Sequence, residues 1–114
     1  MDKFENIFLK NHNEVRQKYQ LHPLKMDGNL TRYAWVHIQE LLDNQSVYHG
    51  NIPEKSLQNI ASGKKNLLKE NVCVNLWIND PAHRAPIINK MFTKIGFAHH
   101  IDNDNNVIIV CNYS

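Results

Sequence analysis

The sequence predicts a single α+β domain. Three segments in the first two thirds of the chain repeat apolar residues at helical spacing, and two β-branched and aromatic runs follow in the last third. Helical segments ahead of a hairpin are typical of the α+β class. A chain of 114 residues is long enough for one hydrophobic core and too short for two, so residues 1–114 are expected to form one domain.

The first helix is predicted over residues 3–20, where apolar side chains recur at helical spacing opposite charged ones. Asp2 stands just before it, and aspartate is a preferred N-cap residue. A proline and a glycine then interrupt the pattern, and a second helix follows over about residues 29–43. Residues 65–79 return to helical spacing and predict the third helix.

The rest of the chain divides into one polar segment and one hairpin. Residues 44–66 are polar and contain two glycines and a proline, which predicts irregular structure. Residues 92–101 and 106–114 are rich in β-branched and aromatic side chains. The stretch Asp-Asn-Asp-Asn-Asn lies between them and predicts a hairpin turn.

Composition excludes several classes of function. The net charge is only +2 and no run of Lys and Arg exceeds two residues, so the chain lacks the concentrated basic face that nucleic-acid binding requires. No apolar run approaches the roughly 20 residues that span a bilayer, so no transmembrane segment is expected. The printed sequence also carries no export signal, because no charged n-region precedes an apolar h-region.

The two cysteines, Cys73 and Cys111, allow one disulfide. Loop-closure entropy gives such a bond about 3–4 kcal/mol of stabilisation where strain is small. The alternative is a pair of small buried hydrophobic side chains, which free cysteines often are. Both readings stay open, but the apolar patterns around the two residues disfavour a reactive thiolate.

Six short segments carry recognisable motifs in a fixed order. They are NHNEVR (11–16), HPLKMDGNL (22–30), YHG (48–50), LQNIASG (57–63), LWINDPAHRAPIINKMFTKIGFA (76–98) and VCNYS (110–114). Together they resemble the signature motifs of the CAP superfamily, which includes cysteine-rich secretory proteins, antigen 5 and pathogenesis-related 1 proteins, in a bacterial-type form. The resemblance implies an α/β/α sandwich, with a small antiparallel sheet and helices on both sides.

The resemblance also implies a central cleft lined by two histidines and two acids, in which the histidine pair can hold a divalent metal such as zinc. Carried over by motif, the histidines are His49 and His83. Two imidazoles leave a tetrahedral zinc site half filled. At the first acid position the chain has Gln58 in place of glutamate, and an amide neither takes up a proton near neutral pH nor adds negative charge.

Asp80 is the candidate for the second acid. Directly before Pro81, it also fits the N-cap of a short helix with proline at the first helical position. We favour the capping role over a metal or catalytic role, although Pro86 raises the alternative that the helix begins only there. His12, in the first motif, is expected to hydrogen-bond within the fold, and Trp35 and Trp77 are expected in the core.

The resemblance favours a non-enzymatic, secreted or cell-surface binding module for a protein or lipid ligand, because binding does not require a glutamate at Gln58. A lipid-anchored bacterial surface protein is one such form. The alternative is a zinc-dependent hydrolase, a peptidase, in which His49 and His83 hold zinc and Asp80 activates water. The sequence does not identify the ligand.

Overall fold

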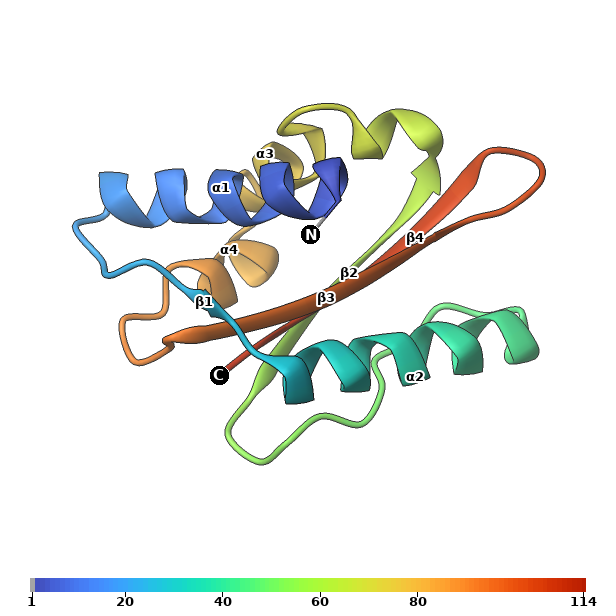
Figure 1. Cartoon of the computed structure of the whole chain (residues 1–114), viewed down its shortest axis with the longest axis horizontal. Helices are drawn as coiled ribbons and strands as arrows, with labels where there is room; N and C mark the ends of the chain where they lie inside the picture. The colour runs from blue at the N-terminus through green and yellow to red at the C-terminus, as the bar shows by residue number, and fades with distance from the viewer. Residues whose placement is uncertain (1) are drawn as a thin grey trace.

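The computed structural model describes residues 2–114 and has helices on both sides of one sheet (Figure 1). In chain order the elements are α1 (Lys3–Lys18), β1 (Lys25–Met26), α2 (Gly28–Asn44), β2 (Leu57–Lys64), the 3-10 helix η1 (Lys65–Leu68), α3 (Val72–Ile78), α4 (Pro81–Ile87), β3 (Lys94–Ile101) and β4 (Asn106–Tyr113). Helix α2 covers one face of the sheet, and α1, α3 and α4 cover the other. The predicted α+β class and α/β/α sandwich are confirmed.

The sheet has the strand order β1-β3-β4-β2, with the last strand in the sequence near its centre. β3 and β4 form the predicted hairpin, and β2 pairs antiparallel with the other side of β4. The two residues of β1 pair in parallel with the start of β3. The long strands are therefore antiparallel as expected, and β1 makes the complete sheet mixed.

The prediction of irregular structure over residues 44–66 is wrong for its second half. Residues Leu57–Lys64 form β2, which pairs with β4 over its full length. Two consecutive polar residues, Gln58 and Asn59, hid the strand pattern, because both are buried and hydrogen-bonded inside the molecule rather than exposed to solvent.

The predicted helices begin close to their expected positions. The Asp2 side chain accepts a hydrogen bond from the Glu5 N–H at 2.8 Å, so the predicted cap of α1 is confirmed. The third helix is split into η1 and α3, because Glu70 lies between them with a φ of 45°, outside the helical region. Among residues 2–114, no helix combines the length and apolar character needed to cross a membrane.

Two hydrophobic clusters fill the layers on either side of the sheet. Trp77 is 3% exposed and lies in the cluster under α1, α3 and α4, as predicted. Trp35 is 51% exposed, so its predicted core position is wrong. The buried side of α2 is formed instead by the positions around Ala34 and Ile38, and the residue after Ala34 is rotated about 100° away from them.

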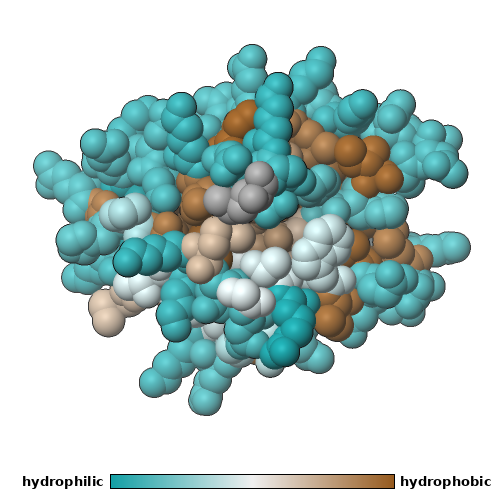
Figure 2. All heavy atoms as spheres, viewed as in Figure 1, coloured by the Kyte–Doolittle hydropathy of each residue, from teal (hydrophilic) through white to brown (hydrophobic). Residues whose placement is uncertain are grey.

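Helix α2 approaches the sheet closely at Gly96 in β3. A Cβ atom built there would lie 2.2 Å from the backbone nitrogen of Thr31 and 2.6 Å from the Cβ of Leu30. Only glycine fits this contact without moving the helix. On the face seen in Figure 2, hydrophobic atoms reach the surface in separate patches among hydrophilic side chains.

A buried cation, Arg16, joins α1 to the segment that leads from α4 to β3. Arg16 is 1% exposed, and its guanidinium donates hydrogen bonds to four backbone carbonyls at 2.7–3.0 Å. These carbonyls belong to His22, Ile87, Asn89 and Phe92. The side chain therefore fixes the end of α4 and the approach to β3 against α1.

Candidate functional site

His49 is held at the surface by Gln58, near the start of β2. The His49 Nδ1 lies 3.0 Å from the Gln58 Oε1, and the Gly50 N–H donates to the same oxygen at 2.9 Å. Because an amide oxygen only accepts, Nδ1 carries the proton of this bond. In the neutral ring the lone pair is then on Nε2.

The Gln58 amide extends this hydrogen-bond network into the interior of the protein. Its Nε2 donates to Asn112 Oδ1 at 2.8 Å, and the Asn112 Nδ2 donates to the Leu30 carbonyl in α2 at 3.1 Å. A glutamate at position 58 would present only acceptors toward Asn112, which has its own N–H group committed to Leu30. These hydrogen bonds therefore require an N–H donor at position 58, which glutamine has and an ionised glutamate lacks.

Asp80 and His83 form the second part of the site. Asp80 has the extended backbone of an N-cap (φ −116°, ψ 118°), its carbonyl accepts from Arg84 N at 2.8 Å, and Pro81 opens α4. Its side chain makes no capping bond to the helix backbone and accepts a hydrogen bond from His83 Nδ1 instead. The expected capping side chain is therefore used to orient an imidazole, and α4 begins at Pro81 and includes Pro86.

His83 also stacks on a buried aromatic ring. Its imidazole lies parallel to the Trp77 indole, with an interplanar angle of 11° and ring centroids 6.1 Å apart. The His83 side chain is 39% exposed and the Asp80 side chain 49% exposed. The carboxylate and the indole thus fix the ring while leaving it open to solvent.

Consecutive residues of β2 connect the two parts. Gln58 and Asn59 point to opposite faces of the sheet, as neighbours in a strand do. Gln58 holds His49, while the Asn59 Nδ2 donates to the His83 carbonyl at 2.8 Å. Within residues 2–114 no hydrogen bond joins the His49–Gln58 pair directly to the Asp80–His83 pair, and both are connected through β2.

A buried hydrogen-bond chain lies beneath His83 on the α1 face. Asn59 Nδ2 also donates to the Tyr113 hydroxyl at 3.2 Å, and that hydroxyl lies 2.8 Å from His12 Nε2. His12 Nδ1 lies 2.8 Å from the Phe8 carbonyl, so Nδ1 carries the proton and Nε2 accepts from Tyr113. Burial lowers the pKa of His12 to about 4, so the ring is neutral near pH 7.

Sequence reasoning missed three residues of this arrangement: Asn59, Asn112 and Tyr113. The available signal was the presence of adjacent polar residues, Gln-Asn and Asn-Tyr, inside segments that are otherwise apolar. In a buried strand such residues need internal partners. Gln58 lies directly opposite Asn112 in the pairing of β2 with β4, and Asn59 lies diagonally across from Tyr113, so the two strands provide those partners.

The cysteines are neutral thiols, and one of them borders the buried hydrogen-bond chain, with the Cys111 Sγ 4.0 Å from His12 Nε2. Cys73 and Cys111 are both buried and both free thiols, which matches the second of the two readings left open by the sequence. Burial raises the pKa of Cys73 to about 12 and that of Cys111 well above the ordinary value. Neither thiol is therefore ionised near neutral pH.

The donor set does not complete a zinc site. His49 and His83 each have one ring nitrogen committed to a hydrogen bond, which leaves two Nε2 atoms as ligands. Structural and catalytic zinc sites use three or four protein ligands. Among the described residues, no group of three or more His, Cys, Asp or Glu side chains is arranged to hold a metal ion.

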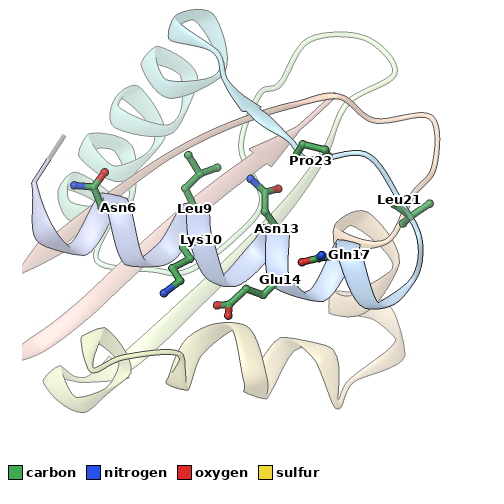
Figure 3. Close-up of a pocket in the computed structure, with 8 residues that line it drawn as sticks. All are labelled: Asn6, Leu9, Lys10, Asn13, Glu14, Gln17, Leu21 and Pro23. Atoms are coloured by element: carbon green, nitrogen blue, oxygen red, sulfur yellow. The ribbon is translucent and has the colours of Figure 1, made fainter.

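The site is open rather than enclosed, and a separate groove lies elsewhere. A groove of about 590 Å³ runs along α1 and is bounded by Leu21 and Pro23 (Figure 3). Its lining includes neither His49 nor His83. The case for the candidate site therefore rests on its hydrogen-bonding chemistry and not on cavity size.

Comparison with known proteins links this geometry to one family. A family model described as the cysteine-rich secretory protein family, CAP, matches residues 9–113. An uncharacterized protein of Borreliella burgdorferi is 30% identical over 107 residues, which cover 85% of this chain and 69% of that protein.

Two solved structures have similar folds. An outer surface protein from Borrelia burgdorferi superposes with a TM-score of 0.85 and 26% identity, covering 99% of this chain and 94% of that one. An extracellular protein containing an SCP domain from Bacillus anthracis superposes with a TM-score of 0.73 and 18% identity, covering 96% of this chain and 40% of that one. The three proteins described here are bacterial, and both of these solved structures are of proteins named as outer surface or extracellular.

Proposed function

The chain belongs to the cysteine-rich secretory protein (CAP) family, and on that basis we propose that it is a non-enzymatic binding module that acts outside the cell or at its surface. Its ligand is a protein or a lipid. The names of the outer surface protein from Borrelia burgdorferi and of the extracellular protein from Bacillus anthracis support this location. Attachment through a lipid anchor is one form that the proposal includes.

The observation that carries the proposal is the amide at position 58. Gln58 accepts from His49 and Gly50 and donates to Asn112, so every polar atom of its side chain has a structural partner. A residue committed in this way cannot exchange a proton with a substrate at neutral pH. A site with one carboxylate and an amide held by structural partners is suited to recognition rather than to acid–base chemistry.

A zinc-dependent hydrolase is the second candidate, and the Asp80–His83 pair favours it. A carboxylate that orients an imidazole is a common arrangement beside catalytic metals. The available ligands, two imidazole nitrogens, complete only half of a tetrahedral zinc set, so zinc binding stays a prediction. The residues present do not fit a resident zinc ion without further ligands.

A cleavage assay separates the two candidates. The protein is incubated with zinc and a mixture of fluorogenic peptides, beside the variants His83→Ala and, as a matched control, His22→Ala at an exposed histidine outside the candidate site. The proposal predicts no cleavage by any of the three proteins. Zinc-dependent cleavage that is lost only in His83→Ala would overturn it.

Location is tested on intact producing cells. If the protein acts outside the cell, a protease added to intact cells removes it, or it is recovered from the medium. Full protection until the cells are lysed would contradict the proposed location.

A further inference from the structure

The outer edge of β2 is an unpaired strand edge beside the candidate site. β2 is the last strand of the sheet and runs for eight residues, which is about 26 Å of extended backbone (Figure 1). Within residues 2–114, its backbone pairs only with β4, and no other hydrogen bond reaches its N–H or C=O groups. Half of these groups therefore face outward without a protein partner.

Proteins usually protect such edges with charged side chains, proline, bulges or covering segments, and the one charged residue within β2 is Lys64 at its end. β2 contains no proline and pairs with β4 without a bulge from Leu57 to Lys64. Helix α4 approaches only one face of the strand, where Asn59 reaches the His83 carbonyl through its side chain. Gln58 and Asn59 are only 8% and 2% exposed, so the part of the edge that remains available to another extended chain is residues 60–64.

We infer that the β2 edge binds an extended, acidic peptide segment of a partner protein as an additional strand of the sheet. The inference rests on the proposed binding function and specifies its partner. Main-chain pairing supplies affinity in such complexes, and pockets for alternate side chains supply specificity. The outward N–H and C=O groups of β2 are spaced along the strand, so another extended backbone can pair with several of them, whereas a compact ligand cannot.

Charge indicates that the peptide is acidic. From Leu57 to Lys69 the chain has three lysines and no acidic residue. Lys64 and Lys65 lie at the far end of the edge and are both exposed. Acidic side chains on an added strand would lie beside them, whereas basic ones would be repelled.

Apolar surface lies at two points along the same edge. Leu57, at the start of β2, is 42% exposed although it is a large hydrophobic residue. At the other end, a pocket of about 320 Å³ borders Ser62 and Gly63, with Val47 in its wall and one acidic residue, Asp102, in its lining. An extended peptide that contacts Leu57 with one apolar residue can place another toward this pocket.

The test is a selection from phage-displayed random decapeptides on the wild-type protein, with removal of peptides that also bind the double variant Lys64→Glu/Lys65→Glu. Enriched peptides are expected to contain acidic residues that alternate with apolar ones. A synthetic copy of one such peptide is expected to bind the double variant at least about tenfold more weakly. Lys90→Glu, at an exposed lysine outside the edge, is the matched control and is expected to change affinity less than about twofold.

Backbone pairing is tested directly by methylating every second backbone nitrogen of the same peptide, which is expected to lower affinity at least about tenfold. Amide hydrogen exchange by NMR is expected to slow at alternate residues of β2 when the unmodified peptide binds. Equal binding of the methylated peptide, protection at another element, or failure to enrich any peptide would overturn the inference. Protection of β2 that grows with protein concentration without peptide would overturn it in favour of a second copy of the chain.

The fate of the peptide separates this inference from the proposed function. Mass spectrometry is expected to recover the bound peptide intact. Cleaved peptide would refute the non-enzymatic function, whereas intact peptide bound away from β2 would refute the edge inference alone.

Discussion

The neutral state of His12 makes the stability of the fold dependent on pH. Its pKa falls from 6.5 to about 4 because the ring is fully buried. Between these two values the unfolded chain binds a proton that the folded protein excludes. The contribution of neutral His12 is therefore fully present above pH 6.5, declines as the pH falls toward 4, and is lost below it.

The size of the effect follows from the difference between the two pKa values. Acidification from pH 7 to pH 4 is expected to remove about 3 kcal/mol of unfolding free energy through His12 alone. His99 adds to the same trend, because partial burial also lowers its pKa.

The assay is urea unfolding at several pH values between 7 and 4, with the wild type beside His12→Gln. Glutamine does not titrate, so the variant is expected to be less stable at pH 7 but to lose about 3 kcal/mol less on acidification. His22→Gln, at an exposed histidine, is the matched control and should follow the wild type. Parallel pH profiles of His12→Gln and the wild type would refute the assignment of a neutral, buried His12.

Three further substitutions test other parts of the structure. Arg16→Met leaves four backbone carbonyls, two of them buried, without their donor and is expected to cost more than about 4 kcal/mol in urea unfolding. Arg16→Lys is expected to recover only part of this loss, and a loss below about 1 kcal/mol for Arg16→Met would contradict the proposed role of the guanidinium. Gln58→Glu is expected to lower the free energy of unfolding by about 1–3 kcal/mol at pH 7. The loss is expected to be smaller at pH 4, because a protonated carboxyl again donates to Asn112. An unchanged unfolding midpoint at pH 7 would contradict the amide network. Gly50→Ala would place a Cβ 2.1 Å from His37 Nδ1, so NMR should show displaced signals across the loop before β2, and an unchanged spectrum would contradict this packing.

The architecture could be predicted from the sequence because its helices and hairpin carry strong local signals. The spacing of apolar residues in α1 and α2 and the β-branched runs of β3 and β4 are local properties that burial reinforces. β2 could not be found in this way, because its Gln58 and Asn59 look like loop residues until the partners Asn112 and Tyr113 are known. Those partners lie 54 residues away in the sequence.

The four candidate site residues come from sequence motifs and their shared role stays a prediction, whereas the contacts that each of them makes could not be predicted. Motif positions identified His49, Gln58, Asp80 and His83, and the structure gives two hydrogen-bonded pairs, His49–Gln58 and Asp80–His83. Local sequence predicted that Asp80 would cap α4. The side chain instead bonds to His83, three residues later, because an imidazole within reach competes with the helix N–H groups for the same carboxylate. Capping propensity alone contains no information about that competition.

The position of β4 within the sheet has a consequence for the folding of the protein during its synthesis on the ribosome. Synthesis runs at about 5–20 residues per second from the N-terminus, and β4 is the last of the four strands to be made. It is also the only strand of the sheet with which β2 pairs. All the helices from α1 to α4 are therefore synthesised before β3 and β4, the two strands that join the sheet together. Until β4 has left the exit tunnel, β2 has no partner strand and the layers on either side of the sheet cannot close around it.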